Sequence, residues 1–216
     1  MDAQPVIALG REGVPIRIAD EAHPEPAALV EAARSAHFLR SEDDLYPGMR
    51  APAPERWKAW LAGALAVWPQ LSGAAILRAD YAIASQDPAT LSPVQRIPHF
   101  DTTDPAVLAV IHYLCDAPHR GTSFHRHRRT GFEQITPPRA PLWRQALVAD
   151  SARYGLPGSR YHQDDTATFE RIGTAALRFN RLVVYPANCL HCGDIAETWA
   201  RGDRLTITAL IKVCAA

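Results

Sequence analysis

The sequence has no excess charge of either sign. Lysine and arginine together number 23, as do aspartate and glutamate, so the formal net charge is zero. Without a net positive field, binding to nucleic acid or to an anionic membrane is disfavoured. With 47% hydrophobic and 21% charged residues, the composition also excludes a wholly disordered chain or a coiled coil.

Long hydrophobic runs are also lacking. The longest apolar stretches, residues 61–68 and 106–114, are about half the length that a bilayer span needs. The first ten residues contain Asp2 and no basic residue before a short apolar stretch, which is unlike a secretory signal. We therefore expect a cytoplasmic protein that does not cross a membrane.

Cysteines are few and irregularly spaced, at positions 115, 189, 192 and 214. Such a set does not form a disulfide framework in a chain that can build its own core. Cys189 and Cys192 flank His191 as a C-x-x-C, the spacing of many zinc sites. Structural zinc would need two further ligands at a compatible spacing, so we expect two buried thiols instead.

The length of 216 residues predicts one domain over 1–216, with a helical flank at 1–74 and a core at 75–213. One helix is expected at 27–38, after Pro24 and Pro26, because proline suits a first helical turn. Another should follow Pro54, because apolar residues recur there at three- and four-residue steps and predict a face that packs on a sheet. They are Trp57, Trp60, Leu61, Ala64, Leu65 and Trp68.

The rest of the chain has the pattern of short strands, interrupted by a helical insert at about 130–172 whose helix spans 140–154. The expected strands are 78–84, 94–101, 107–114, 122–127, 175–179, 182–185 and 205–213. Short strands without interleaved helices indicate antiparallel sheets. The predicted fold is α+β and mainly β, a double-stranded β-helix or jelly roll with N-terminal flanking helices.

The types and spacing of His99, Asp101 and His191 predict a metal site. His99 and Asp101 are two apart in an expected strand or strand end, so both side chains leave on one face. His191 follows the expected strand at 182–185 and is the candidate third ligand. Two histidines and one carboxylate on one face of an octahedron leave three positions open, as in non-haem Fe(II) oxygenases.

The last expected strand separates a polar from an apolar face. Leu205, Ile207 and Ala209 should point one way. Arg204, Thr206 and Thr208 should point the other way, which places a guanidinium and a hydroxyl side by side as a fork for a carboxylate.

In this order, the elements resemble the Fe(II)/2-oxoglutarate-dependent dioxygenases, particularly their prolyl-4-hydroxylase-like branch. The resemblance covers about residues 76–213 and includes the segments 111–114 and 120–124. It implies that His99, Asp101 and His191 hold Fe(II) and are catalytic, and that Arg204 and Thr206 bind 2-oxoglutarate. Dioxygen would be the other co-substrate, succinate and carbon dioxide would be released, and hydroxylation would be the usual outcome.

The sequence departs from that branch at two places. Arg96 stands where a tyrosine is common, and the usual glycine pair is reduced to Arg120 and Gly121. The substrate is left open among small molecules, peptides and proteins, with nucleic acid disfavoured by the neutral charge, and the oligomeric state is not indicated. The insert at 130–172 could form a lid over the cavity mouth or only cover a sheet.

Two other readings stay open. A cupin-type metal site would use His125, His127, Glu133 and His191, but it gives no role to His99, Asp101 or Arg204. A catalytically silent jelly-roll binding module is the other alternative. The arginines at 126, 128 and 129 form either a solvated face or contacts to an acidic or phosphorylated substrate.

Overall fold

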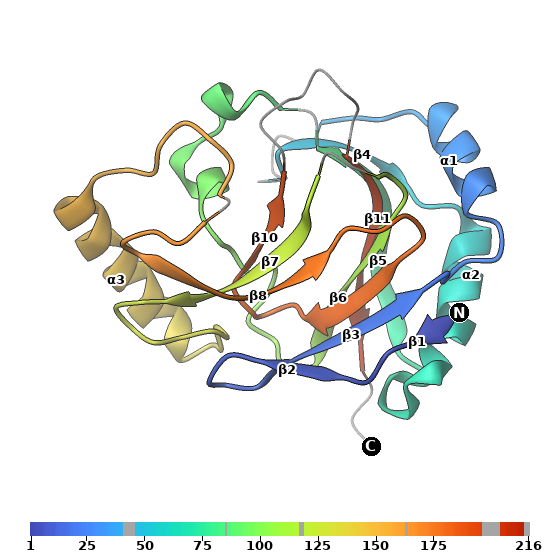
Figure 1. Cartoon of the computed structure of the whole chain (residues 1–216), viewed down its shortest axis with the longest axis horizontal. Coiled ribbons are helices and arrows are strands. Elements are labelled where there is room, and N and C mark those ends of the chain that lie inside the picture. The colour runs from blue at the N-terminus through green and yellow to red at the C-terminus, as the bar shows by residue number, and fades with distance from the viewer. Residues whose placement is uncertain (41–45, 85, 117–118, 163, 196–203, 214–216) are drawn as a thin grey trace.

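Two facing β-sheets form the body of the computed structural model, which describes residues 1–40, 46–84, 86–116, 119–162, 164–195 and 204–213 (Figure 1). Every strand pair is antiparallel. The larger sheet has the order β1 (Asp2–Ala3), β3 (Val14–Asp20), β9 (Leu182–Pro186), β6 (Val107–Tyr113), β11 (Arg204–Lys212), β5 (Ala75–Ala84) and β4 (Gly48–Pro52), and β2 (Ile7–Leu9) pairs with β3. The smaller sheet has the order β10 (His191–Asp194), β7 (Gly121–His127) and β8 (Phe169–Ala176).

Helices α1 (Pro26–Arg34) and α2 (Glu55–Ala64) lie beside the larger sheet (Figure 1). From α2, Trp57 and Leu61 are fully buried in a core cluster that includes Val110 and Ile207 of the sheet. The predicted packing face of the tryptophan-rich helix is therefore confirmed. Short 3-10 helices follow at Leu65–Val67, Pro69–Leu71, Pro88–Thr90 and Pro93–Arg96.

A second apolar cluster fills the space between the two sheets. The ring of Phe124 on β7 meets that of Tyr185 on β9 edge to face, with centroids 5.1 Å apart. Ile16 and Ile18 of β3 belong to this cluster as well. These contacts pack the inner faces of the two sheets against each other.

Helix α3 (Arg139–Tyr154) confirms the helix predicted at 140–154. Its Trp143 packs with Phe169 of β8 and with Leu190 in a third apolar cluster. Trp143 also meets the ring of Phe100 edge to face at 5.3 Å. Since Phe100 lies between His99 and Asp101, this contact ties the expected metal-binding segment to the helix.

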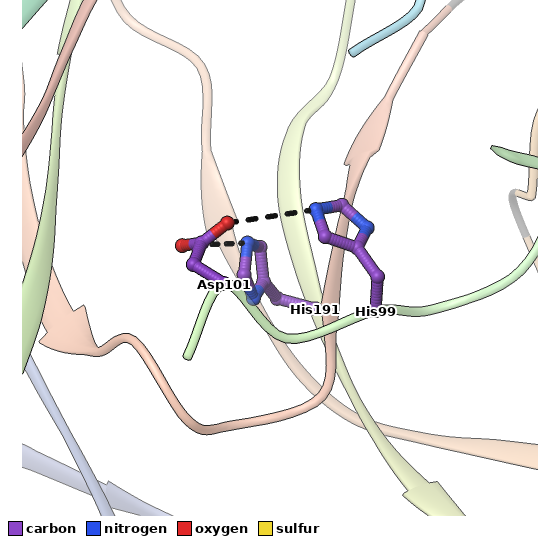
Figure 2. Close-up of side chains that lie close together, drawn as sticks. All are labelled: His99, Asp101 and His191. Carbon is purple, nitrogen blue, oxygen red and sulfur yellow. Dashed lines mark ion pairs between the residues drawn. The ribbon is translucent and has the colours of Figure 1, made fainter. Parts of the chain in front are cut away.

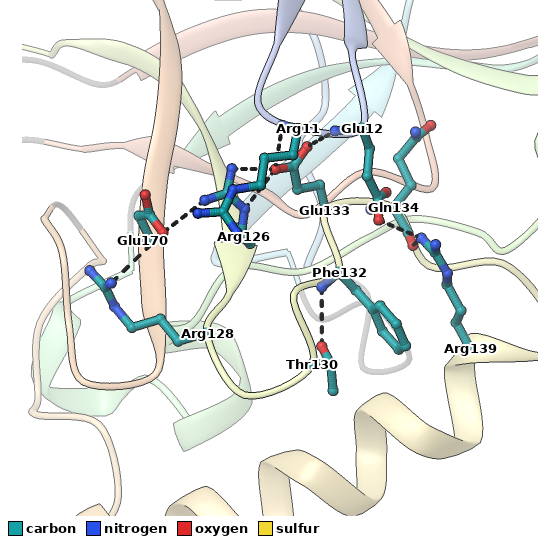
Figure 3. A network of polar contacts seen from close by, with 10 residues as sticks. All are labelled: Arg11, Glu12, Arg126, Arg128, Thr130, Phe132, Glu133, Gln134, Arg139 and Glu170. Atoms are coloured by element: carbon teal, nitrogen blue, oxygen red, sulfur yellow. Dashed lines mark hydrogen bonds and ion pairs between the residues drawn. The ribbon is translucent and has the colours of Figure 1, made fainter.

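The turn between β2 and β3 is bound by hydrogen bonds to Glu133, which lies between β7 and α3 in the sequence (Figure 3). The backbone amides of Arg11 and Glu12 each donate to the Glu133 carboxylate at 2.9 Å. Gly10 has a φ of +68°, and a Cβ there would collide with that carboxylate. Glycine is therefore required at this position both for its backbone conformation and for space.

Three expectations need correction. Residues 1–74, expected as a helical flank, also supply strands β1 to β4. Residues 93–96, within an expected strand, form a 3-10 helix, because Ser92 and Gln95 make a capping box and Pro93 suits a first helical turn. The strand expected at 175–179 is β8, which ends at Ala176.

No helix within the described ranges is long and apolar enough to cross a membrane.

Candidate metal centre

His99, Asp101 and His191 come together at the edge of the smaller sheet (Figure 2). The first two lie between the 3-10 helix Pro93–Arg96 and β6, and His191 is the first residue of β10. The amide of His99 donates to the carbonyl of His191 at 2.9 Å, and the reverse bond is 2.8 Å. A further bond, from the amide of Asp101 to the carbonyl of Ala187 at 2.8 Å, fixes the carboxylate beside them.

The three side chains have the spacing of a metal site. One ligand atom from each lies within 4.8 Å of the others. Asp101 Oδ1 is 4.0 Å from His99 Nε2, and Asp101 Oδ2 is 3.7 Å from His191 Nε2. Ligands at metal distances of about 2.1 Å lie about 3 Å apart on adjacent positions, so small side-chain rotations suffice. The donor set therefore fits a divalent metal ion.

His191 is oriented for this role by a backbone contact. Its Nδ1 lies 3.0 Å from the carbonyl oxygen of Cys189, which can only accept, so Nδ1 carries the proton. The Nε2 lone pair is then left for the metal, an arrangement common among metal-binding histidines. The ring is buried and meets Tyr185 edge to face at 4.8 Å.

The three candidate ligands line a cavity of about 430 Å³, and so does Arg204. Arg204 is 4% exposed. Its Nη2 donates to the carbonyl of Gly121 at 2.9 Å, while no described residue accepts from its Nε. A buried guanidinium without a carboxylate partner is costly unless a ligand pairs with it. The site is thus suited to a carboxylate ligand.

The rest of strand β11 follows the predicted division into two faces. Leu205 and Ile207 join the core beneath α1 and α2, whereas Thr208 lines the cavity with Arg204. Thr206 is fully buried, but its hydroxyl donates to the carbonyl of Ala82 at 3.4 Å, and it is not among the residues that line the cavity. The structure thus brings Arg204, but not Thr206, onto the cavity wall.

Two residues of the cupin alternative, His127 and Glu133, are paired with other side chains. His127 contacts Asp150 through Nε2 and Thr130 through Nδ1, both at 2.9 Å. Glu133 is paired with Arg126 at 2.6 Å. Within the described part of the chain, the only group with the spacing of metal ligands is His99, Asp101 and His191.

Of the three clustered arginines, Arg126 is buried, whereas Arg128 and Arg129 are exposed and each makes an ion pair. Arg126 is 7% exposed and bridges Glu133 and Glu170, the latter at 2.9 Å (Figure 3). Arg128 pairs with Asp165 at 3.0 Å. Arg129 pairs with Asp150 at 2.7 Å. These charges hold β7, β8 and α3 together.

Cys189 and Cys192 are buried, as predicted, and bear no sign of a zinc site among the described residues. Burial raises the pKa of Cys192 to about 12 and that of Cys189 well above its ordinary value, so both are thiols at neutral pH. Cys192 lines the cavity. Cys214 lies outside the described residues.

Several residues of the cavity wall are not marked by any pattern in the sequence. Tyr161 and His162, from the segment between α3 and β8, line the cavity together with Thr122 and Tyr185. The segment has no regular period, so no pattern in the sequence marks its inward residues. The contribution of Tyr161 and His162 shows that the insert reaches the cavity.

Comparisons with known proteins give one family and a set of structural relatives. A family model described as "Family of unknown function (DUF6445)" matches residues 3–211. No curated protein matches the chain.

The solved structures that resemble the chain include non-haem enzymes. The α-ketoglutarate-dependent epimerase SnoN from nogalamycin biosynthesis is 12% identical, with 91% of this chain and 76% of that one covered and a TM-score of 0.53. HygX from Streptomyces hygroscopicus, with nickel and 2-oxoglutarate bound, is 9% identical, with 91% and 82% covered and a TM-score of 0.56. AviO1 from Streptomyces viridochromogenes is 14% identical, with 93% and 90% covered and a TM-score of 0.53. At these identities the likeness establishes a shared fold.

Proposed function

Because the chain belongs to DUF6445, a family of unknown function, its activity has to follow from its own site, and we propose that it is a non-haem Fe(II)/2-oxoglutarate-dependent oxygenase. It would hydroxylate a protein, peptide or small molecule and release succinate and carbon dioxide. Fe(II), 2-oxoglutarate and dioxygen are the proposed metal and co-substrates.

One observation carries the proposal. His99, Asp101 and His191 offer three metal ligand atoms within 4.8 Å of one another, in the cavity that also contains the buried Arg204. Two imidazoles and one carboxylate leave positions open for co-substrates. With iron and 2-oxoglutarate bound there, dioxygen would supply the oxidising equivalents, two electrons coming from 2-oxoglutarate as it becomes succinate and carbon dioxide and two from a substrate C–H bond.

The chain itself would contribute orientation and exclusion of water. His191 presents Nε2 because Nδ1 is held by the carbonyl of Cys189. Arg204 would pair with the distal carboxylate of 2-oxoglutarate, as a buried guanidinium suits a carboxylate. Thr206 takes at most a secondary role, since its hydroxyl already donates to Ala82. Apolar residues such as Tyr185 and Leu210 complete the wall.

The structural relatives support the proposed class of enzyme, but the reactions that they catalyse differ from one another. SnoN is described as an epimerase and SnoK, with a TM-score of 0.54, as a carbocyclase, both dependent on α-ketoglutarate. We further propose that the reaction is a hydroxylation and that the chain belongs with the prolyl-4-hydroxylase-like branch. The proposal also treats the two sheets as a jelly roll and residues 1–216 as a single domain.

Anaerobic titration tests it. Fe(II) followed by 2-oxoglutarate should produce a visible charge-transfer band in the wild-type protein, and candidate substrates should then increase succinate release in air. His99→Ala, Asp101→Ala and His191→Ala should each lose the band. His127→Ala is the matched control, because His127 is bound to Asp150 and Thr130. Loss of the band in His127→Ala, with retention in His99→Ala, would refute the assignment.

A further inference from the structure

At and behind one wall of the cavity lie several buried polar atoms that have no hydrogen-bond partner among the described residues. They are His125 Nδ1, His162 Nε2, Asp194 Oδ2, and Nε and Nη2 of Arg171. The residues are neighbours: the rings of His125 and His162 meet edge to face at 4.6 Å, and Arg171 Nη2 is 3.8 Å from Asp194 Oδ1. Since nearly all buried polar atoms in proteins are hydrogen-bonded, this concentration indicates a polar ligand at the wall.

Of these residues, His162 lines the cavity. It is 8% exposed, so its unpartnered Nε2 is held inside the protein rather than in bulk water. The carbonyl of His162 lies 3.9 Å from the thiol of Cys192, which directly follows His191. A molecule bonded to His162 would therefore share the cavity with the candidate metal ligands.

The wall has no excess positive charge with which to hold an anion. Burial lowers the pKa of His162 to about 4 and that of His125 to about 2, so both rings are neutral at pH 7. Arg171 is offset by Asp194 and by Asp164, which is 3.6 Å away. Neutral hydrogen-bonding groups thus suit this wall better than a carboxylate or phosphate.

The tautomer of His125 shows how the wall is arranged. Ser123 donates its hydroxyl proton to Asp194 at 2.8 Å, and its oxygen lies 2.9 Å from His125 Nε2. Ser123 therefore accepts from His125, whose proton is on Nε2. This chain holds the ring of His125 edge to face against His162 and limits how His162 can turn.

We propose that His162 selects the primary substrate by a hydrogen bond between its Nε2 and an uncharged hydroxyl or amide group of that substrate. The inference rests on the proposed oxygenase function and adds a substrate class to it: a neutral, hydrogen-bonding molecule at this end of the cavity. His162 acts in recognition and is separate from the metal ligands and from Arg204.

Solvent mapping in the crystal tests this assignment. Crystals of the protein with Ni(II) and 2-oxoglutarate would be soaked separately in propan-2-ol and in sodium acetate. We expect the alcohol hydroxyl within hydrogen-bond distance of His162 Nε2, and acetate absent from that position. His162→Phe should lose the alcohol, and His162→Gln, which keeps a donor and an acceptor, should regain it.

Several outcomes would overturn the inference. These are acetate in place of the alcohol, alcohol only elsewhere, a protein partner that satisfies Nε2, or alcohol retained in His162→Phe. His37→Phe is a matched control because His37 is exposed. If Ni(II) and 2-oxoglutarate fail to bind while propan-2-ol still occupies the position beside His162, the oxygenase proposal is refuted. The assignment of His162 as a binding site for a neutral polar group is then retained.

Discussion

His99 and His191 exchange both backbone hydrogen bonds of an isolated antiparallel bridge, at 2.9 and 2.8 Å. The bridge joins a segment without regular structure to the first residue of β10, and among the described residues no other pair links these segments as a ladder. The relative position of the two imidazoles is therefore set by the backbone. A metal ion would add a bond across a junction that already exists.

Binding of a metal should stabilise the native protein, because the unfolded chain does not hold the three ligands together. At a free Ni(II) concentration of 100 times Kd, the free energy of unfolding should rise by about 2.7 kcal/mol. Urea unfolding with Ni(II) and with a chelator measures this. His99→Ala should abolish the rise, whereas His37→Ala should leave it intact. An equal rise in both variants would place the metal elsewhere.

Arg204 and Thr206 should differ sharply in their contribution to 2-oxoglutarate binding. Arg204→Met removes a charged partner of the carboxylate, and a loss of about 2 kcal/mol corresponds to about 30-fold weaker binding. Thr206→Val should change the affinity by less than about threefold, because the hydroxyl already donates to Ala82. Calorimetry on the anaerobic Mn(II)-loaded protein measures both values. Similar losses in the two variants would contradict the assignment.

Glu133 should matter for stability and not for metal binding. Glu133→Gln leaves the buried Arg126 with Glu170 alone and should lower the free energy of unfolding by about 3 kcal/mol. Glu31→Gln, in the exposed pair with Arg34, should cause no measurable change. Urea unfolding gives the stabilities, and Ni(II) affinity should stay at the wild-type value. Weakened Ni(II) binding in Glu133→Gln would favour the cupin alternative.

His112 should make the protein less stable in acid. Its Nδ1 accepts from Trp57 Nε1 at 3.1 Å and its Nε2 donates to Asn180 at 3.0 Å, so the buried ring is neutral. Burial lowers its pKa to about 4 from an ordinary value of 6.5. Below pH 6.5, His112 binds a proton in the unfolded chain but not in the native protein. The free energy of unfolding therefore falls as the pH drops towards 4.

Between pH 8 and pH 4.5, this one group should remove about 2 to 3 kcal/mol from the free energy of unfolding. His112→Gln keeps one acceptor and one donor and has no titrating ring, so its decrease over the same range should be smaller by that amount. Urea unfolding at the two pH values measures the difference. An equal decrease in both proteins would show that His112 does not contribute.

The sequence predicted the parts of the fold that have a strong local period. The tryptophan-rich face of α2 and the alternation along β11 were both recognisable, because a buried face repeats every 3.6 residues in a helix and every two in a strand. Strands β1 and β2 are only two and three residues long, which is too short for a period to show. They form because β3 offers them an edge, and that edge exists only in the folded sheet.

The amino-acid sequence by itself determined which chemical groups this protein has and their order: two histidines, one aspartate and one arginine that together form the candidate site. Tertiary structure decided which of its other polar groups are available. His127 and Glu133 look like ligands in the sequence, but His127 contacts Asp150 of α3, and Glu133 accepts from the amides of Arg11 and Glu12. His162 lies in no recognisable sequence motif, yet in the folded protein it lines the cavity and its Nε2 has no partner among the described residues. The reason is that hydrogen bonds form between groups that are close in space, and the order of residues in the sequence does not show which groups these are.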